Sequence, residues 1–400
     1  MDKDTQQDDS RSVLSRVRRD RSVRSALFVF ALTRGIVFAI FVLATNFITV
    51  GEVKPIDELK QPVIDLHGRA IVERLRPLGY RGDAGWYTST AREGYQRQAF
   101  DATEQHNWAF FPLYPMVLRL AAALTGEFHL TGMLLSNIFF LPALILLHKT
   151  ALAFNLDEGD ADRCIFYLAV FPTSYFFSLA QTEALFLLTT VGSFYAAMRD
   201  RWWLAGVAGA MATATRFSGI FLVPALALLY WKQYGLRPRV NVLGLFLIPL
   251  GLLSFMLFLH MITGNAFAFK DVLVAWQRSS GFFLLPLFNY ILRFRLVVES
   301  WDFHALNFAA SLLALACGIV FAKRREWPFA LYTLLSIIAP LSSLRLQSHA
   351  RYVLTIFPVF MLLAQWGRQP LVDQTIRTIF IVMLGLMAAL FATYFTVAMS

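Results

Sequence analysis

Long, continuous apolar runs dominate this chain of 400 residues and constrain its fold more than any other feature. Hydrophobic residues make up 57% of the chain and charged residues 16%, with a mean hydropathy of +0.56. Soluble domains average roughly 45–50% apolar and about 25% charged residues. Several runs exceed the ~18 apolar residues that indicate a membrane-spanning helix, and they are continuous rather than alternating, which argues against a β-barrel. The sequence therefore predicts an all-α polytopic membrane protein.

We expect about eleven transmembrane helices within a single domain, residues 26–400. Counting from a cytoplasmic N-terminus places nearly all the basic loops on the cytoplasmic side, as the positive-inside rule requires. The Arg-rich tail, residues 1–25, is expected to stay in the cytoplasm, and the first helix is expected to be an uncleaved anchor. The predicted spans are 26–48, 129–153, 163–180, 183–198, 202–215, 217–231, 240–262, 303–321, 328–344, 350–366 and 375–397.

This topology leaves two long segments on the outer side, which we name the first outer segment (49–128) and the second outer segment (263–302). Within the first, 107–124 must not cross the membrane, or every later loop would change sides. Its aromatic residues and prolines suit an interfacial helix, and a short span is the alternative. The net charge of +10 lies largely in short loops, so it gives no reason to expect nucleic-acid binding. Cys164 and Cys317 fit no metal-ligand spacing and read as small core residues.

Asp83 is the strongest candidate for chemistry. It lies between Gly82 and Gly85, followed by Trp86 and Tyr87. The glycines allow a tight turn or a close approach to a ligand, and the aromatic rings suit the headgroup level of a membrane. An Asp at such a boundary can act as a general base, a role worth roughly 10²–10⁴-fold in rate. A solvated loop carboxylate or a helix N-cap is the plain alternative.

Gln181, Thr182 and Glu183 form a second candidate, in a tight outer turn between two predicted spans. A Glu at the mouth of apolar helices is costly unless it is paired, hydrated or functional. The alternative is a helix start, with Thr182 as the N-cap and Glu183 in the first turn.

Four basic residues fall on the outer side, where the positive-inside rule disfavours them: Arg216, Arg345, His349 and Arg351. An anionic partner would explain their position. Arg binds phosphate through a planar fork, so we expect a lipid phosphate there, with snorkelling toward lipid headgroups as the alternative. Arg34, in the first span, is expected to snorkel toward the cytoplasmic surface.

The stretch 107–115 adds aromatic residues, including Trp108 and Tyr114, that could shape an acceptor surface beneath Asp83, although simple interfacial packing would give the same pattern. The sequence contains no P-loop, no dinucleotide-binding glycine pattern and no His-Glu-x-x-His motif. Nucleotide hydrolysis and zinc proteolysis therefore gain no support.

Taken in order, several short motifs resemble the PIG-V-type mannosyltransferases over about residues 80–360. These are RGDAGWY at 81–87, AREGY at 91–95, FFPLYP at 110–115, FPTS at 171–174, QTEALF at 181–186, ATRFSG at 214–219, RY at 351–352 and FP at 357–358. That family belongs to the C-type (GT-C) glycosyltransferases, whose members use polyprenyl- or dolichyl-phosphate sugars and carry a catalytic Asp in the first large outer loop.

The resemblance implies an inverting transfer in which Asp83 is the catalytic base and Glu183 lies near the active site. It implies that Arg216, Arg345, His349 and Arg351 bind the donor phosphate, and that substrate contacts come from Arg81, Trp86, Tyr87, Trp108, Tyr114, Gln181 and Thr182. Acidic residues at the Glu183 turn bind metal in some distant relatives, so a divalent ion is an open possibility. The expected acceptor is a lipid, glycan or protein hydroxyl.

Two functions remain open at this stage. The first is a glycosyltransferase of the bacterial plasma membrane, with an extracytoplasmic active site and mannose as the expected sugar. The second is a transporter or flippase of lipid-linked sugars, which would also need outer basic residues and a lipid-accessible groove. Transporters often contain repeated halves, and the sequence shows no such repeat.

Overall fold

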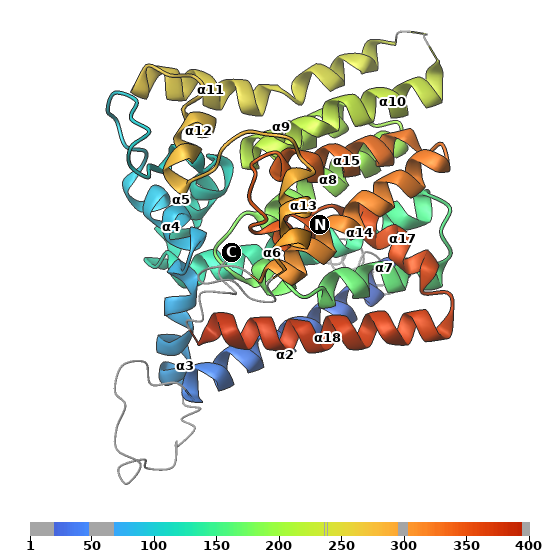
Figure 1. Ribbon diagram of the computed structural model, residues 1–400, viewed down its shortest axis with the longest axis horizontal. Helices are drawn as coiled ribbons and strands as arrows, with labels where there is room; N and C mark the ends of the chain where they lie inside the picture. The colour runs from blue at the N-terminus through green and yellow to red at the C-terminus, as the bar shows by residue number, and fades with distance from the viewer. Residues whose placement is uncertain (1–19, 48–67, 236, 238, 295–302, 394–400) are drawn as a thin grey trace, which may run out of the picture.

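Helices form nearly all of the described chain, and the long ones run side by side along one direction (Figure 1). The computed structural model describes residues 20–47, 68–235, 237, 239–294 and 303–393. Most of the predicted basic tail, the start of the first outer segment and the end of the second lie outside these residues. Within the described residues the structure contains no strand, so the all-α prediction is confirmed.

Each predicted span corresponds to one helix or to a pair of consecutive helices. In chain order they are α2 (Arg21–Phe47), α6 (His129–Ala153), α7 (Glu158–Val170) with η4 (Ser174–Ser178), α8 (Glu183–Met198), α9 (Trp202–Thr215), η5 (Phe217–Phe221) with α10 (Leu222–Tyr234), η6 (Val240–Leu247) with α11 (Leu250–Thr263), α14 (His304–Lys323), α15 (Trp327–Leu341), α16 (His349–Leu354) with α17 (Phe357–Trp366), and α18 (Pro370–Ala392).

Five of these, among the described residues, are long and apolar enough to cross a membrane: α2, α6, η6 with α11, α14 and α18. This makes the chain an integral membrane protein. The remaining predicted spans are shorter or interrupted, so the total of eleven stays a prediction. Cys164 and Cys317 are both buried and unbonded, as expected of core residues.

Prolines explain two of the interruptions. Pro172 follows the end of α7, and Pro358 occupies the start of α17. Proline lacks an N–H group and disfavours a helical conformation in the residue before it, so a helix ends there and a new one begins. Each break leaves backbone carbonyl groups without helical partners, and such groups are tolerated at membrane depth only where protein surrounds them.

Arg34 supplies partners to the break after α7. Its guanidinium group donates hydrogen bonds to the carbonyl oxygens of Ala169 and Ser174, each at 2.8 Å. The side chain is 3% exposed and lies 5.0 Å from the ring centroid of Phe140. The expected snorkelling of Arg34 is therefore wrong, because a nearby helix break offers closer acceptors than the membrane surface.

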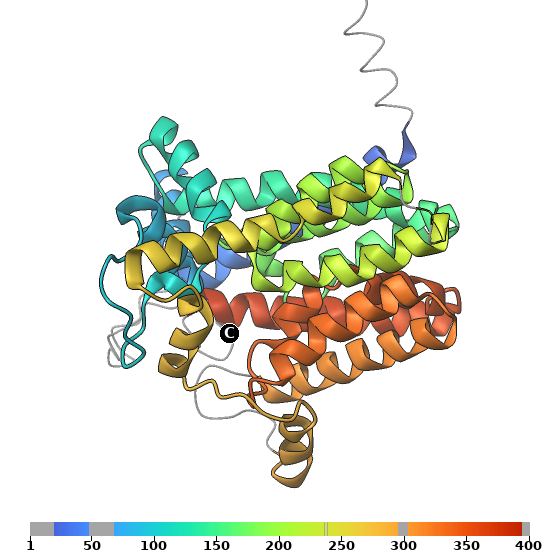
Figure 2. The same cartoon turned by 90° about the horizontal axis from the view of Figure 1, so that it is seen from above.

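Most of the described parts of the two outer segments lie at one end of the bundle, which we call the site end (Figure 1). The first outer segment forms α3 (Gly68–Leu75), η2 (Arg76–Tyr80), α4 (Asp83–Glu93), η3 (Asn107–Ala109) and α5 (Leu113–Thr125). The second forms α12 (Ala268–Asp271), η7 (Val272–Trp276) and α13 (Leu285–Leu292), and α13 stands away from the bundle in Figure 2. The 13 residues of α5 span ~20 Å, about as much as α9, so the interfacial position expected for 107–124 stays a prediction.

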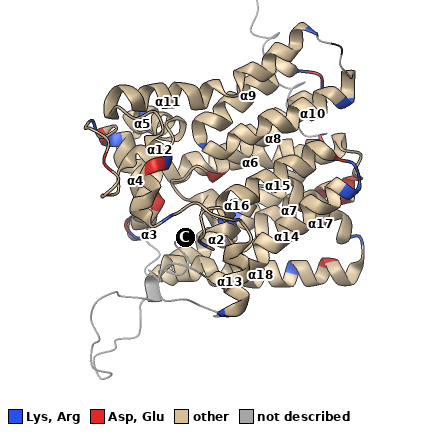
Figure 3. Cartoon of the chain, turned by 45° about the horizontal axis from the view of Figure 1, so that its top comes forward, with Lys and Arg blue, Asp and Glu red and all other residues tan. Residues whose placement is uncertain are grey.

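The opposite end carries the short charged loops, and we call it the charged-loop end. Lys232, at the end of α10, pairs with Glu326 at 2.7 Å, just before α15. Arg324, at the end of α14, donates to the side chain of Gln365 in α17. Figure 3, in which the ribbon is coloured by residue type, shows that most charged positions lie toward the two ends of the bundle. The charge map predicted from the sequence thus corresponds to a physical separation along the bundle.

Candidate active site

The turn that leads into α4 places Asp83 at the start of a helix. Gly82 has φ +56° and ψ −135°, a conformation that strains residues with a side chain. A Cβ atom on Gly85 would lie 2.7 Å from the carbonyl oxygen of Tyr80, so the backbone packs against itself here rather than against a ligand. Asp83 is the first residue of α4, where the positive end of the helix dipole favours a carboxylate.

Arg351 joins Asp83 to Glu183. Its Nη1 donates to Asp83 Oδ2 and its Nε donates to Glu183 Oε1, both at 2.5 Å. Arg216 also donates to Glu183 Oε1, from Nη2 at 2.7 Å. These four side chains come from α4, α8, α16 and the residue that ends α9. We call them the carboxylate–guanidinium cluster.

Burial differs sharply within the cluster. The side chains of Glu183 and Arg351 are 0% and 3% exposed, that of Arg216 is 15% exposed, and that of Asp83 is 41% exposed. A charge buried as completely as Glu183 requires paired charges, which the two arginines provide. Asp83 is the carboxylate that solvent or a substrate can reach. Among the described residues its Oδ1 has no hydrogen-bond partner, so one oxygen remains open to an incoming hydroxyl.

Aromatic rings enclose the two arginines. The Arg351 guanidinium lies 4.7 Å from the ring centroid of Phe176. Arg216 lies 5.9 Å from Phe186 and 6.0 Å from Tyr352. Cations over aromatic faces gain about 0.5–2 kcal/mol, more when water is excluded. The rings therefore stabilise the guanidinium groups while keeping them away from bulk water.

Several buried polar atoms of the site have no hydrogen-bond partner within the described part of the chain: Glu183 Oε2, Arg351 Nη2, and both Gln181 side-chain amide atoms. Gln181 is itself 0% exposed. An unsatisfied buried polar group costs about 1–3 kcal/mol, and native proteins contain few of them. Glu183 Oε2 can accept a hydrogen bond and Arg351 Nη2 can donate one, and the two residues form an ion pair. A hydroxyl group both donates and accepts, so it could satisfy both atoms.

Tyr87 and Trp86 form the wall beside Asp83. The Tyr87 hydroxyl lies 3.4 Å from the Thr182 hydroxyl, which connects α4 to the turn before α8. Burial raises the pKa of Tyr87 to about 12. Trp86 stacks on Phe110 at 5.4 Å between centroids and meets Trp276 of η7 edge-on at 5.9 Å. Thr182 occupies the N-cap position of α8, with Glu183 in the first turn, but its side chain makes no capping hydrogen bond.

Other predicted site residues lie away from the cluster. Trp108 is fully buried, donates to the Gln96 carbonyl oxygen at 2.8 Å and packs among the aromatics of α11 and α12. Tyr114 donates to the Gly132 carbonyl oxygen at 2.9 Å, with its ring against Tyr87. Arg81 donates to the Phe391 carbonyl oxygen in α18. These three side chains hold helices together, because each uses its polar group on a distant backbone carbonyl.

His349 does not fit a phosphate-binding role. It is 0% exposed, Nδ1 lies 2.9 Å from the Ser311 hydroxyl, and Nε2 lies 3.0 Å from the Arg345 carbonyl oxygen. Both ring nitrogens are therefore engaged inside the protein, and a phosphate would find no accessible N–H on this residue.

Sequence reasoning missed Arg278, in the loop after η7. Its Nη2 donates to the Tyr352 hydroxyl at 3.0 Å, and the pKa of Arg278 is raised, chiefly by Tyr352 and with a further contribution from Asp83. Next to it, Gln277 accepts a hydrogen bond from Arg345. The criterion that singled out Arg345, an arginine on the predicted outer side, applies equally to Arg278 and could have identified it.

The residues present fit a metal ion poorly. The described residues hold no group of three or more His, Cys, Asp or Glu side chains arranged around one point. Both carboxylates of the cluster are already bound by guanidinium groups, which a cation would have to displace.

Comparison with known proteins identifies the fold. Neither family models nor curated proteins match the sequence. Among solved structures, ArnT from Cupriavidus metallidurans, bound to undecaprenyl phosphate, superposes with a TM-score of 0.51 and 14% identity, over 92% of this chain and 76% of that one. The apo oligosaccharyltransferase of Archaeoglobus fulgidus aligns with a TM-score of 0.44 and 13% identity over 91% of this chain. The chain spans 55% of the oligosaccharyltransferase. The likeness to ArnT shows that this chain shares the helical fold of that protein.

Proposed function

We propose that this protein is an inverting glycosyltransferase that moves a sugar from a polyprenyl-phosphate donor to an acceptor hydroxyl at the extracytoplasmic face of the bacterial plasma membrane. One observation carries the proposal: Asp83 is half-exposed at the start of α4, while a buried ion pair holds it beside Glu183. The fold shared with a protein that was crystallised with undecaprenyl phosphate supports the class of donor.

In the proposed reaction Asp83 Oδ1 takes the proton of the acceptor hydroxyl. The acceptor oxygen attacks the anomeric carbon, the bond from that carbon to the phosphate oxygen breaks, and its electron pair leaves with the polyprenyl phosphate. Arg351 positions Asp83 through the Nη1 hydrogen bond. A base held in this way needs no reorientation as the substrate arrives, which lowers the entropic part of the barrier.

Glu183 and Gln181 have buried polar atoms without partners among the described residues, and these atoms could bind the sugar in the proposed reaction. Sugar hydroxyls both donate and accept, so they can satisfy Glu183 Oε2, Arg351 Nη2 and the Gln181 amide together. We propose that these groups bind hydroxyls of the donor sugar. The motif resemblance to PIG-V-type enzymes makes mannose the first sugar to test.

The test uses purified protein in lipid nanodiscs with polyprenyl-phosphate mannose and a panel of acceptors. We expect a glycosidic product from wild type and from Glu104→Gln, which removes an exposed carboxylate of the same outer segment. Asp83→Asn should abolish product formation. Normal turnover by Asp83→Asn would contradict the proposal. In liposomes, movement of labelled lipid across the bilayer without any new glycosidic bond would favour the flippase instead.

A further inference from the structure

The charges of the carboxylate–guanidinium cluster balance one another. Asp83 and Glu183 face Arg351 and Arg216, two negative groups against two positive ones. Arg351 is almost completely buried between its carboxylates. A phosphate that replaced Glu183 on Arg351 would break a pair in which both side chains are buried, at a cost of about 3–5 kcal/mol. The donor that remains on Arg351, Nη2, is the one that we assign to a sugar hydroxyl.

Two other arginines at the site end have no such compensation. No carboxylate in the described chain lies within ion-pair distance of Arg278 or Arg345. Their hydrogen-bond partners are neutral: the Tyr352 hydroxyl for Arg278 and the Gln277 side-chain oxygen for Arg345. Each of these bonds uses only Nη2, and a guanidinium group carries five N–H donors. Both side chains are partly exposed.

Backbone contacts bring these two arginines to one place. Gly281 N donates to the Ser342 carbonyl oxygen at 2.9 Å, which fastens the loop after η7 to the end of α15. Gln277 has φ +57° and ends η7, so the chain turns there and places Gln277 against Arg345 and Arg278 against Tyr352.

Arg278 also lies close to the cluster. Tyr352 is the neighbour of Arg351 in sequence, and its ring faces Arg216 at 6.0 Å. The charges of Asp83 and Arg351 both act on Arg278, the first favourably and the second unfavourably. A phosphate bound by Arg278 would therefore lie near the carboxylate that we propose as the base.

We propose that Arg278 and Arg345 form the phosphate-binding pair for the lipid-linked donor, while Arg351 and Arg216 remain bound to the carboxylates. This inference rests on the proposed function and replaces Arg216, His349 and Arg351 as phosphate ligands. As the bond to the anomeric carbon breaks, its electron pair adds negative charge to the phosphate that the pair holds. Preorganised donors aimed at developing charge lower the barrier to such a step.

The test measures binding and turnover in nanodiscs for wild type, Arg278→Gln, Arg345→Gln and the control Arg293→Gln. Arg293 is exposed at the end of α13, so its replacement removes the same charge from the same outer segment. Four probes separate the ligand sources: a polyprenyl phosphate, the matching polyprenol, inorganic phosphate and phosphatidic acid.

We expect Arg278→Gln and Arg345→Gln each to weaken polyprenyl-phosphate binding about 10–100-fold, as loss of a charge-assisted hydrogen bond should. The KM for the donor should rise, and Arg293→Gln should bind as wild type does. Arg278→Lys should recover only part of the affinity, because Lys keeps the charge but lacks the planar fork. Polyprenol should bind more weakly and be indifferent to Arg278, because it lacks the phosphate. Inorganic phosphate and phosphatidic acid should also bind more weakly than polyprenyl phosphate, and any binding that they show at this site should fall in Arg278→Gln.

Unchanged polyprenyl-phosphate binding in both Gln variants would overturn the inference, as would equally tight binding of polyprenol or of phosphatidic acid. Should Arg278→Gln fail to fold, Arg345→Gln carries the test, because Arg345 lies partly exposed at the rim. The two proposals fail separately. If sugar transfer depends on Asp83 but is unchanged by replacement of either arginine, only the phosphate-binding pair is contradicted. If lipid-phosphate binding depends on Arg278 but no acceptor receives a sugar, only the proposed enzyme activity is contradicted.

Discussion

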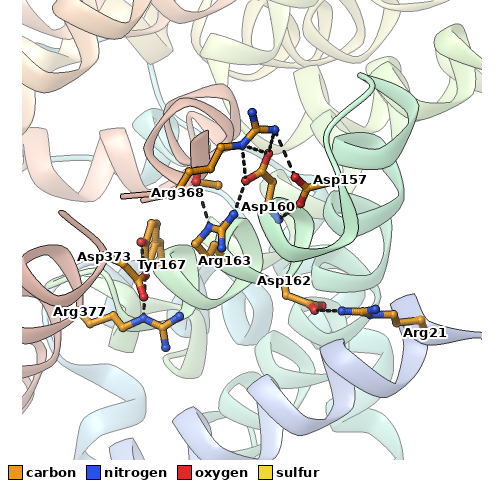
Figure 4. Close-up of polar contacts among 10 residues, drawn as sticks. Arg21, Asp157, Asp160, Asp162, Arg163, Tyr167, Arg368, Asp373 and Arg377 are labelled. Atoms are coloured by element: carbon orange, nitrogen blue, oxygen red, sulfur yellow. Dashed lines mark hydrogen bonds and ion pairs between the residues drawn. The ribbon is translucent and has the colours of Figure 1, made fainter. Parts of the chain in front are cut away.

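Two networks of charged side chains lie at the two ends of the bundle, and they differ in whether both oxygens of their buried carboxylate have hydrogen-bond partners. At the charged-loop end, Asp160 is fully buried, yet both of its carboxylate oxygens have partners. It accepts from Arg163 and from Arg368, whose Nε lies 3.1 and 3.0 Å from the two oxygens (Figure 4). At the site end, Glu183 is equally buried but leaves Oε2 without a partner among the described residues.

The remaining pairs at the charged-loop end also join helices, although the buried His148, which contacts Asp162 at 3.1 Å, leaves Nδ1 without a partner among the described residues. Arg377 donates to Asp373 at 2.8 Å, and the Tyr167 hydroxyl donates to the same oxygen (Figure 4). Arg21 of α2 donates to Asp162 of α7 at 2.7 Å. These bonds join α2, α7 and α18. The fully bonded carboxylate of Asp160 holds helices together, whereas Glu183 keeps one oxygen available for a ligand, and this is why we place the chemistry at the site end.

The largest expected effect comes from removing the carboxylate of Asp83, the exposed member of the carboxylate–guanidinium cluster. Asp83→Asn should lower the rate of sugar transfer by at least about 10²–10⁴-fold, the usual worth of a general base. Its thermal unfolding should stay close to that of wild type, because the Asp83 side chain is 41% exposed. Transfer assays and unfolding curves on the same nanodisc samples would check both points. If Asp83→Asn lost activity only because it unfolded, Asp83 would have a structural role, and the site end would not differ in function from the charged-loop end.

Glu183→Gln should have the largest effect on stability. It leaves Arg351 and Arg216 without their shared buried counter-charge, which should lower the free energy of unfolding by about 3–5 kcal/mol. Adding Arg216→Gln should recover part of this loss, because one uncompensated charge is removed. Denaturant unfolding of both variants and of Arg216→Gln alone gives the coupling energy. Additive effects would show that Glu183 and Arg216 do not form the pair described here.

At the other end, Asp160→Asn should cost less, about 1–3 kcal/mol. The Arg368 side chain is 54% exposed and that of Arg163 is 22% exposed, so water can solvate both cations once the carboxylate is gone. Transfer activity per folded molecule should not change. The same unfolding and transfer assays apply, and a fall in kcat at constant folded fraction would mean that the charged-loop end is coupled to catalysis.

Tyr87→Phe should give the smallest effect, below about 1 kcal/mol, because the contact to Thr182 is long at 3.4 Å. Its pH dependence is more informative. Burial raises the pKa of Tyr87 to about 12, above the ~10 of an unfolded chain. The neutral phenol therefore contributes fully to stability below about pH 10, and this contribution declines as the pH rises toward 12. Unfolding curves across alkaline pH should show this decline in wild type and a smaller one in Tyr87→Phe.

The sequence was a good guide to helices and a partial guide to the site. Apolar length predicted the elements from α2 to α18, and the glycines around Asp83 predicted its tight turn. The outer position of Glu183 and Arg351 singled them out, and the structure brings both to Asp83. The same reasoning misplaced His349, because a position next to two outer arginines does not reveal that its ring turns inward to Ser311.

The phosphate ligands show the limit most clearly. Arg351 and Arg278 meet the same sequence criterion, an arginine on the predicted outer side. Only the folded chain reveals that Arg351 is neutralised by carboxylates 168 and 268 residues away, whereas Arg278 contacts a neutral hydroxyl.

What the sequence determined by itself is the class of fold: a membrane excludes unpaired backbone groups, so long apolar runs must become helices. It also set which residues lie near each end, because charges stay out of the apolar middle. The tertiary structure decided the pairing of charges, since that depends on how helices far apart in the chain pack together. Pairing in turn decides which groups are occupied and which can meet a substrate.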